Sequence, residues 1–314
     1  MSHKNEIEAA ADRSKRVDLH CHTLASDGSL TPEQLCRRAV ELRIDVLAIT
    51  DHDTVAGYRQ ARDFLQLAAL QTEPLPLQLL PAAEYSCLWR NLNVHVIGLG
   101  IDTDHAAADE AFSFLHAARL QRAEMIGAKL EKLRMPGIYA GAMALAGTSQ
   151  IGRPHFARTM VELGFVTSVD AAFNRFLGAG KVGDVKVMWP SLEQVVQWIR
   201  AAGGVAVLAH PLKYKLTATR LRLLIAEFKA AGGEAMEVVT GRQQGDWSFL
   251  AELCRKNELE ASQGSDFHGP GMGWGDLGEI AAMPSGCKPV WQRWSTSGKS
   301  GGHSGGQNQS WKQA

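Results

Sequence analysis

The sequence has 314 residues, of which 45% are hydrophobic and 21% charged, a composition typical of a globular enzyme with a core and not of a disordered chain. Lysine plus arginine and aspartate plus glutamate both number 33, so the formal charge is zero and no global field favours nucleic acid or an anionic membrane. Any anion recognition must therefore be local.

The chain contains no apolar run of the roughly 18 residues that a membrane helix needs, and residues 1–16 lack the apolar stretch of a signal peptide. We therefore expect a cytoplasmic protein with no membrane association. The five cysteines are odd in number and lack CxxC pairing, which favours small core thiols over a disulfide framework or a zinc ribbon. Trp189 and Trp198 are interpreted as core residues rather than base-stacking platforms.

Short β-rich runs alternate with helical stretches from residue 17 onward, the pattern of a parallel sheet built from βα units. The predicted strands span residues 17–21, 45–50, 77–81, 94–99, 205–209, 235–239 and 260–264. Seven such strands indicate an α/β protein with a barrel or a nearly closed sheet.

Between residues 105 and 200 the sequence changes to Ala-rich amphipathic helix, which predicts a helical insertion, or cap domain. The insertion would separate a first part of the barrel at residues 17–104 from a second part at residues 201–294. Residues 1–16 are a polar N-terminal segment. Residues 295–314 contain five glycines, five serines and no acidic residue, which predicts a flexible tail.

The first predicted strand runs into the segment VDLHCHTLASDG. Alternate side chains of a strand share a face, so His20 and His22 point the same way and could grip one metal ion. Asp27 follows in a turn-prone Ser-Asp-Gly segment, within reach of the same strand end. An isolated HxH is more often a pair of surface or core histidines, so the rest of the chain must decide.

The second predicted strand runs into DHDT, at the strand end where βα barrels place their active sites. His52 is the candidate ligand in this segment. Asp51 and Asp53 could be acceptors that orient imidazoles, or Asp53 could cap the next helix, and the sequence leaves both open.

The same argument applies to Glu84, His95, His210, Asp266 and His268, each of which interrupts or ends an apolar β run. A carboxylate such as Glu84 can bridge two metals, while imidazoles and other carboxylates complete sites suited to Zn, Mn or Fe. Together with the first two strands, these residues indicate a metal centre at one end of the sheet.

The ordered motifs HxH, S-D-G, T-D-H-D, a lone Glu, H-x-x-G-L, A-H-P and S-D-x-H resemble the PHP (polymerase and histidinol phosphatase) superfamily across residues 17–290. The resemblance implies a distorted (β/α)7 PHP barrel with an inserted small helical cap domain. It also implies two or three divalent metal ions, with Mn favoured and Zn, Fe or Mg as alternatives. The ligands that it implies are His20, His22, Asp27, His52, Glu84, His95, His210, Asp266 and His268. Some relatives carry histidine at the position of Asp27, which leaves open how the third metal is held.

Two metals about 3.5–4 Å apart would lower the pKa of a bridging water, so a metal-bound hydroxide would be the nucleophile. The sequence has no GxSxG-type elbow, and this chemistry requires no serine or cysteine nucleophile. Protonation of the leaving alcohol would come from a metal-bound water or from a nearby histidine, for which His155 is the candidate.

The predicted insertion contains GRPHFA, which places Arg153 and His155 on either side of a proline at a predicted helix start. A guanidinium and a helix N-terminus both favour phosphate. Lys181 in FLGAGKVG and Lys213 after the His210-Pro pair are further substrate-binding candidates.

The GRPHFA and FLGAG segments narrow the resemblance to small stand-alone TrpH/YciV-like phosphoesterases. These include 3′,5′-nucleoside bisphosphate phosphatases and 5′→3′ exoribonucleases that act on short RNA. We therefore expect hydrolysis of a 3′,5′-nucleoside bisphosphate to the nucleoside 5′-monophosphate and phosphate, with cleavage of short 5′-phosphorylated RNA as the alternative. The expected partner is a small nucleotide or short RNA, and no obligate protein partner is evident.

Three rival interpretations remain at this point. A histidinol phosphate phosphatase shares the barrel but is disfavoured by the GRPH segment. A non-catalytic metal-binding module, like the PHP domains attached to polymerases, is disfavoured by the filled ligand set. An ordinary TIM barrel with sugar or amidohydrolase chemistry would need a different order of ligands.

Overall fold

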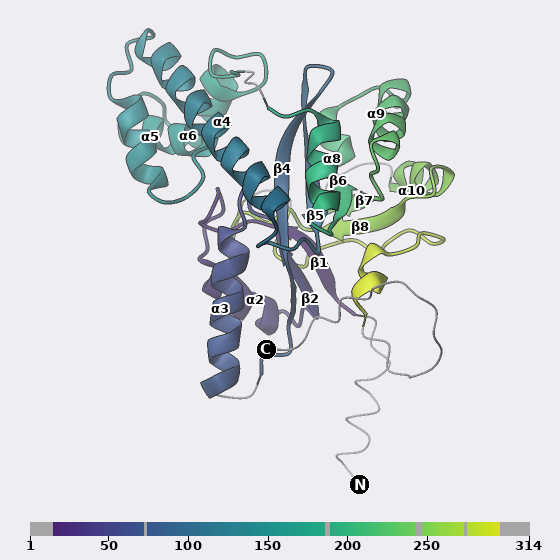
Figure 1. The fold of residues 1–314 in the computed structure, drawn as a ribbon. Helices are drawn as coiled ribbons and strands as arrows, with labels where there is room; N and C mark the ends of the chain where they lie inside the picture. Colours follow the sequence, from purple (N-terminus) through teal and green to yellow (C-terminus); the bar gives the residue numbers. More distant parts are fainter. Residues whose placement is uncertain (1–14, 72–73, 186–188, 243–246, 273–274, 296–314) are drawn as a thin grey trace, which may run out of the picture.

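The computed structural model describes residues 15–71, 74–185, 189–242, 247–272 and 275–295 (Figure 1). The predicted N-terminal segment lies outside the described residues except for residues 15–16. The predicted Gly/Ser-rich tail also lies outside them except for Ser295.

The strands form two sheets that meet at both of their margins. Strands β1 (Val17–Cys21), β2 (Val46–Ile49) and β3 (Gln78–Leu80) form a parallel sheet in the order β1-β2-β3. The second sheet has the order β4-β5-β6-β7-β8, with β4 (Ala82–Trp89), β5 (Leu92–Leu99), β6 (Val205–Leu208), β7 (Ala235–Thr240) and β8 (Glu260–Gly264). Single bridges link His52 to Glu84 at one margin and Cys21 to Phe267 at the other.

The hairpin of β4 and β5 departs from the predicted parallel arrangement. The sequence-based prediction missed β4, ending a strand at residue 81, so the described residues contain eight strands rather than seven. Arg90 and Asn91 form the two-residue turn and have φ values of 46° and 65°, the left-handed backbone that a tight hairpin turn uses. Because β5 is also antiparallel to β6, the second sheet is mixed.

An apolar cluster lies between the two sheets and takes side chains from β1 through β7, among them Leu19, Val46, Leu80, Ile97 and Val207. Such alternation of inward apolar residues on facing strands is what buries a shared core. The α/β class predicted from the sequence is therefore confirmed.

Helices cover the outside of the sheets (Figure 1). Helix α2 (Pro32–Glu41) packs on α3 (Ala56–Gln71), which contacts β2. Helix α8 (Leu192–Ala201) packs against β4, β5 and β6, α9 (Ala218–Ala230) packs on α8, and α10 (Trp247–Lys256) packs against β7 and β8. The short 3-10 helices are η2 (Pro211–Tyr214) and η3 (Val290–Trp294), and η3 contacts β8.

The segment between β5 and α8 is helical, as predicted, and its helices pack on one another beside the strands (Figure 1). They are α4 (Ala106–Glu131), α5 (Ile138–Ala146), α6 (Arg153–Glu162), α7 (Val169–Ala172) and the π-helix η1 (Phe173–Leu177). Helix α8 overlaps the end of the predicted insertion 105–200 but packs on the sheet. The insertion's boundaries as a domain remain a prediction.

All five cysteines are free, and Cys21, Cys36, Cys87 and Cys254 are buried, as expected of core thiols. Trp189 and Trp198 are buried as well. No helix in the described part of the chain combines the length and the apolarity needed to cross a bilayer.

Candidate metal centre

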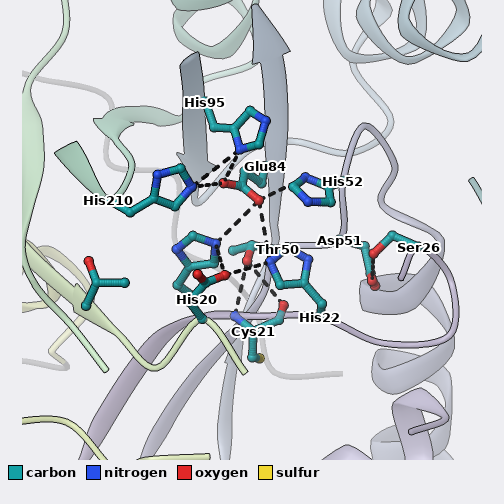
Figure 2. Close-up of polar contacts among 12 residues, drawn as sticks. His20, Cys21, His22, Ser26, Thr50, Asp51, His52, Glu84, His95 and His210 are labelled. Carbon is teal, nitrogen blue, oxygen red and sulfur yellow. Dashed lines mark hydrogen bonds and ion pairs between the residues drawn. The ribbon is translucent and has the colours of Figure 1, made fainter. Parts of the chain in front are cut away.

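The first strand presents two imidazoles to the interior, as its alternation predicts (Figure 2). His20 and His22 are fully buried, and their ring centroids lie 5.2 Å apart. Cys21, between them, belongs instead to an apolar cluster with Leu35 and Ile49. The turn after β1 carries Asp27, whose Oδ1 lies 3.9 Å from Nδ1 of His22.

Glu84, on β4, is the centre of the cluster and is 1% exposed (Figure 2). Its Oε1 lies 2.9 Å from Nδ1 of His95 and 2.9 Å from Nε2 of His210. Its Oε2 lies 2.9 Å from Nδ1 of His52. The same oxygen lies 3.4 Å from Nε2 of His20 and 3.4 Å from Nε2 of His22. One carboxylate therefore faces imidazoles from β1, β5 and the ends of β2 and β6.

Asp266, His268 and Asp27 extend the cluster on the side of β8. Oδ1 of Asp266 lies 3.4 Å from Nε2 of both His20 and His22. Asp27 lies 3.4 Å from Nε2 of His268 and 3.8 Å from Nε2 of His52. The structure thus brings all nine predicted ligands together.

The nine side chains form four overlapping groups in which the potential ligand atoms all lie within 4.8 Å of one another. The groups are His22, Asp27, His52 and His268; His20, Glu84 and His210; His20, His22 and Asp266; and His52, Glu84 and His95.

Several buried polar atoms of this cluster make no hydrogen bond within the described residues. They are Nε2 of His20, both ring nitrogens of His22, Nδ1 of His52, Nδ1 of His210 and Oε2 of Glu84. Leaving a buried polar atom unsatisfied costs about 1–3 kcal/mol, so the arrangement calls for further partners. Imidazole nitrogens and carboxylate oxygens are ligands of divalent metals, and this donor set suits such ions.

The electrostatics of the cluster match this chemistry at most positions. Burial opposes a charge on Glu84, but His95, His52 and His20 outweigh it and hold its pKa well below the ordinary value. Burial, with nearby Lys213, lowers the pKa of His210 to about 3. The site therefore presents an ionised carboxylate and an unprotonated imidazole, the forms that coordinate metals.

His20 is an exception. Burial opposes its positive charge, but Glu237 and Glu84 overcome that effect and raise its pKa to about 10. A metal ion that binds His20 must therefore displace a proton, which makes metal affinity depend on pH.

Asp51 and Asp53 have neither of the roles left open by the sequence. Asp51 accepts hydrogen bonds from the Thr23 amide at 2.8 Å and the Ser26 hydroxyl at 2.6 Å, and so fixes the loop that leads to Asp27. Asp53 accepts from the amide of Ser86 at 2.6 Å and forms an ion pair with Arg119 at 2.5 Å. Helix α3 starts three residues after Asp53, at Ala56.

A pocket of about 100 Å³ adjoins the cluster, and Asp27, His52 and His95 are among the residues that line it. The pocket is also lined by Arg119, Arg122, Arg153 and Trp189. The indole of Trp189 lies under two guanidiniums, with its ring centroid 5.6 Å from Cζ of Arg119 and 5.9 Å from Cζ of Arg122. The pocket therefore joins the candidate metal centre to a positively charged wall.

The three arginines differ in their partners. Asp53 neutralises Arg119, whereas Arg122 donates from Nε to the Val185 carbonyl at 3.2 Å, and Arg153 donates to the Leu177 carbonyl at 2.9 Å. Within the described residues, neither Arg122 nor Arg153 has a carboxylate within 4 Å. Burial, and the nearby charges of Arg153 and Arg119, lower the pKa of Arg122 to about 9. Among the described residues, two cations therefore line the pocket without a carboxylate in ion-pair contact, although Asp184 is near enough to favour both charges.

Of the predicted substrate-binding residues, only Arg153 lines the pocket. Arg153 begins α6 and lines the pocket. His155 is 3% exposed, its Nδ1 accepts the Gly152 amide at 3.1 Å, and it does not line the pocket. Lys213 contacts Asp266, and Lys181 is exposed and is not among the residues that line the pocket. The sequence-based reasoning missed Arg119, Arg122 and the position of Trp189.

Comparisons with known proteins bear on this geometry. Residues 18–131 match the profile of the PHP domain. The chain is 44% identical over 278 residues to the 5′-3′ exoribonuclease Rnm of Escherichia coli, covering 88% of this chain and 93% of that protein. It is 39% identical over 278 residues to the 3′,5′-nucleoside bisphosphate phosphatase of Chromobacterium violaceum, covering 88% of this chain and 95% of that protein.

The chain belongs to the PHP family. A solved structure, described as an amidohydrolase from Chromobacterium violaceum with bound sulfate and no metal, has a TM-score of 0.80 to this fold and 38% identity, covering 88% and 95% of the two chains. The resemblance drawn from the ordered motifs is thus confirmed, and the chain is a metal-dependent hydrolase of the PHP phosphoesterase family, acting on phosphate esters.

Proposed function

We propose that the chain hydrolyses phosphate esters of nucleotides with two or three divalent metal ions, Mn being the first candidate. The proposed ligands are His20, His22, Asp27, His52, Glu84, His95, His210, Asp266 and His268. When bound, the ions would activate water as the nucleophile and withdraw charge from the phosphate oxygens. The unsatisfied buried atoms of the cluster support this proposal, because coordination would satisfy them.

The chain's own residues prepare the site for that chemistry. Glu84 is ionised and faces imidazoles on both of its oxygens, so it could contact more than one ion. Lys213 contacts Asp266 and would fix the orientation of that carboxylate. Asp51 would hold Asp27 in reach of the centre through the loop at Ser26.

We also propose the finer architecture that the sequence predicts. The two sheets would form a distorted (β/α)7 barrel, since they share one apolar interior and meet at both margins. The helices α4 to α7 would form a cap over its open end. The arginines of α4 and α6 that line the pocket beside the metal centre support a cap at this position.

The substrate would carry a second phosphate, held by Arg122 and Arg153. The observation that carries this proposal is the Arg122 guanidinium, which is 7% exposed, lines the pocket and lacks a carboxylate partner among the described residues. A buried unpaired cation is costly unless an anion completes it, and a guanidinium fork matches phosphate geometry. Arg122 thus takes the place that the sequence assigned to His155.

A 3′,5′-nucleoside bisphosphate satisfies both sides of the pocket. Its 3′-phosphate would lie at the metal centre and its 5′-phosphate at the arginines. Water would add to the 3′-phosphorus, and the 3′-oxygen would leave and take up a proton. The products would be the nucleoside 5′-monophosphate and phosphate.

Short 5′-phosphorylated RNA is the second candidate substrate. The 44% identity to a protein named as a 5′-3′ exoribonuclease favours it. The same two sites would then hold the terminal 5′-phosphate and the next phosphodiester, which would be cleaved instead of a monoester. The zero net charge of the chain favours short substrates, since binding of long polymers relies on a broad basic surface.

The test is hydrolysis by the Mn-loaded protein of 3′-phosphoadenosine 5′-phosphate, 3′-AMP, histidinol phosphate and a short RNA with or without a 5′-phosphate. We expect the bisphosphate to be hydrolysed well ahead of 3′-AMP. Release of mononucleotides from 5′-phosphorylated RNA alone would move the assignment to the exoribonuclease. Equal hydrolysis of 3′-AMP and the bisphosphate would overturn the two-phosphate proposal, and no hydrolysis of any substrate would overturn the proposed function.

A further inference from the structure

A buried carboxylate lies behind the metal centre and was not among the predicted ligands. Glu237, on β7, is fully buried and is the only ionisable residue of that strand. Its Oε1 lies 2.9 Å from Nδ1 of His20, and its Oε2 accepts the amide N–H of His210 at 2.6 Å. Both oxygens are therefore used, and each holds a residue proposed as a metal ligand.

The local backbone favours this placement. The pairing of β7 with β8 shifts register between Glu237 and Val239, as at a β-bulge. Bulges re-aim side chains beside functional sites. Every residue of β7 is buried, so the carboxylate lies in an apolar strand, where it is costly unless its oxygens accept hydrogen bonds.

The contact with His20 decides which ring nitrogen can coordinate. As an acceptor on Oε1, as it is on Oε2 toward the His210 amide, the Glu237 carboxylate holds the proton of this contact on Nδ1 of His20. Nε2 is then the nitrogen left for a metal. It lies 3.4 Å from Oε2 of Glu84 and 3.4 Å from Oδ1 of Asp266, and it makes no hydrogen bond in the part of the chain that the structure describes.

The contact with His210 acts on the backbone. His210 has φ 29° and ψ 58°, in the left-handed region that non-glycine residues rarely adopt. The hydrogen bond from its amide to Glu237 helps to hold this conformation, which directs the ring so that Nε2 lies 2.9 Å from Oε1 of Glu84. A single carboxylate thus holds two imidazoles on the same face of the centre.

We propose that Glu237 is a positioning residue of the metal centre, which fixes the tautomer of His20 and the backbone of His210 while itself binding no metal. The inference rests on the proposed role of these two histidines as ligands. Hydrogen-bonded partners of this kind commonly set ring orientation and ligand basicity at metal sites.

Glu237→Gln is the sharpest variant because it changes one oxygen to an amide nitrogen at constant size. If the remaining oxygen accepts the His210 amide, the new N–H2 group faces Nδ1 of His20 as a donor. The proton must then move to Nε2, which blocks coordination there. We expect the affinity for Mn or Zn, titrated against a competing chelator, to fall about 10- to 100-fold.

Glu234→Gln is the matched control. Glu234 directly precedes β7, pairs with Arg293 at 3.0 Å and lies away from the cluster, so its replacement should leave metal affinity unchanged. The thermal midpoint of the chelator-treated proteins checks that Glu237→Gln is folded. Unchanged metal affinity in Glu237→Gln would overturn the inference.

A second measurement does not depend on any variant. In the Zn-loaded wild-type protein, long-range ¹H–¹⁵N correlations should show a protonated Nδ1 and a metal-bound Nε2 for His20. Coordination through Nδ1 would overturn the inference while leaving the proposed function intact. A wild-type protein that binds no divalent metal would instead overturn the proposed function together with the inference.

Discussion

The two ends of strands β7 and β8 differ in whether the polar groups around them have partners within the protein. Before and at their starts, Glu260 accepts from Nε of Arg293 at 2.6 Å and from Nζ of Lys288 at 2.7 Å, and Glu234 pairs with the same arginine at 3.0 Å. Their C-terminal ends lead to the metal-ligand cluster, in which His20, His22, His52, His210 and Glu84 have buried atoms without hydrogen bonds among the described residues. Paired charges stabilise the fold, whereas unsatisfied ones indicate where a ligand completes the structure.

The largest expected effect on activity comes from a substitution in the metal-ligand cluster. Replacing Glu84 by Gln removes the charge that faces the imidazoles at almost constant size. Metal content should fall, and turnover should drop about a thousandfold or more, because several kcal/mol of metal-derived stabilisation is lost. Metal analysis and phosphate release measure the two effects. Retention of both would show that the cluster is not the catalytic centre.

The second effect tests the unpaired cation of the pocket. In Arg122→Met, kcat/KM for 3′-phosphoadenosine 5′-phosphate should fall, with a loss of transition-state stabilisation of about 2–5 kcal/mol, the usual cost of losing a buried charged partner. The value for 3′-AMP should change little. Lys181→Met removes a basic residue that is exposed outside the pocket and should alter neither substrate. An equal loss on both substrates in Arg122→Met would contradict the two-phosphate proposal.

The third effect is on stability and comes from Glu260, at the start of β8, where the charges are paired. Glu260→Gln leaves the guanidinium of Arg293 and the ammonium of Lys288 without their shared carboxylate. We expect the free energy of unfolding to fall by about 1–3 kcal/mol while turnover stays within about twofold. Denaturant unfolding and the phosphate assay separate the two quantities. Loss of activity without loss of stability would contradict a purely stabilising role for the paired charges at Glu260.

The smallest effect is the pH dependence of the stability difference between the wild-type protein and Glu260→Gln. Burial opposes the charge on Glu260, but the hydrogen bonds from Arg293 and Lys288 outweigh it and hold its pKa below the ordinary value of 4.5. A depressed carboxyl pKa stabilises the fold above pH 4.5, and this stabilisation is lost as the pH falls through the folded-state pKa. The unfolding midpoints of wild type and Glu260→Gln should therefore converge on acidification. A gap that is constant with pH would exclude the charge as its cause.

Several ligand candidates could be predicted because they interrupt or end apolar β runs, and the ordered PHP-like motifs implied the full set, including Asp27 in its turn. Strand β4 was missed because the predicted strand ended at residue 81 and Glu84 was placed just beyond that strand end. The segments AAEYSCLW and LNVHVIGL stand on either side of the Arg90-Asn91 turn, and two alternating runs joined by a two-residue turn are a hairpin signal. Attention to that alternation would have predicted the antiparallel pair.

The basic wall of the pocket could not be predicted in the same way. Arg119 and Arg122 lie three residues apart on α4, in a helix rich in alanine, where arginines are usually solvated. Only tertiary packing buries them and places Trp189 beneath them. Glu237 did offer a signal, since it is a lone carboxylate in the apolar run AMEVVT, but only the fold identifies its partners.

The turn at Arg90 and Asn91 constrains how this chain could vary in length. In the hairpin, Ser86 lies opposite His95 and Glu84 opposite Ile97, so the face of each side chain depends on the two-residue count of the turn. A one-residue slip in register moves every side chain of a strand to the opposite face, which would turn either Glu84 or His95 away from the centre. We therefore expect active homologues to keep a turn of two residues here, even where the amino acids in the turn differ.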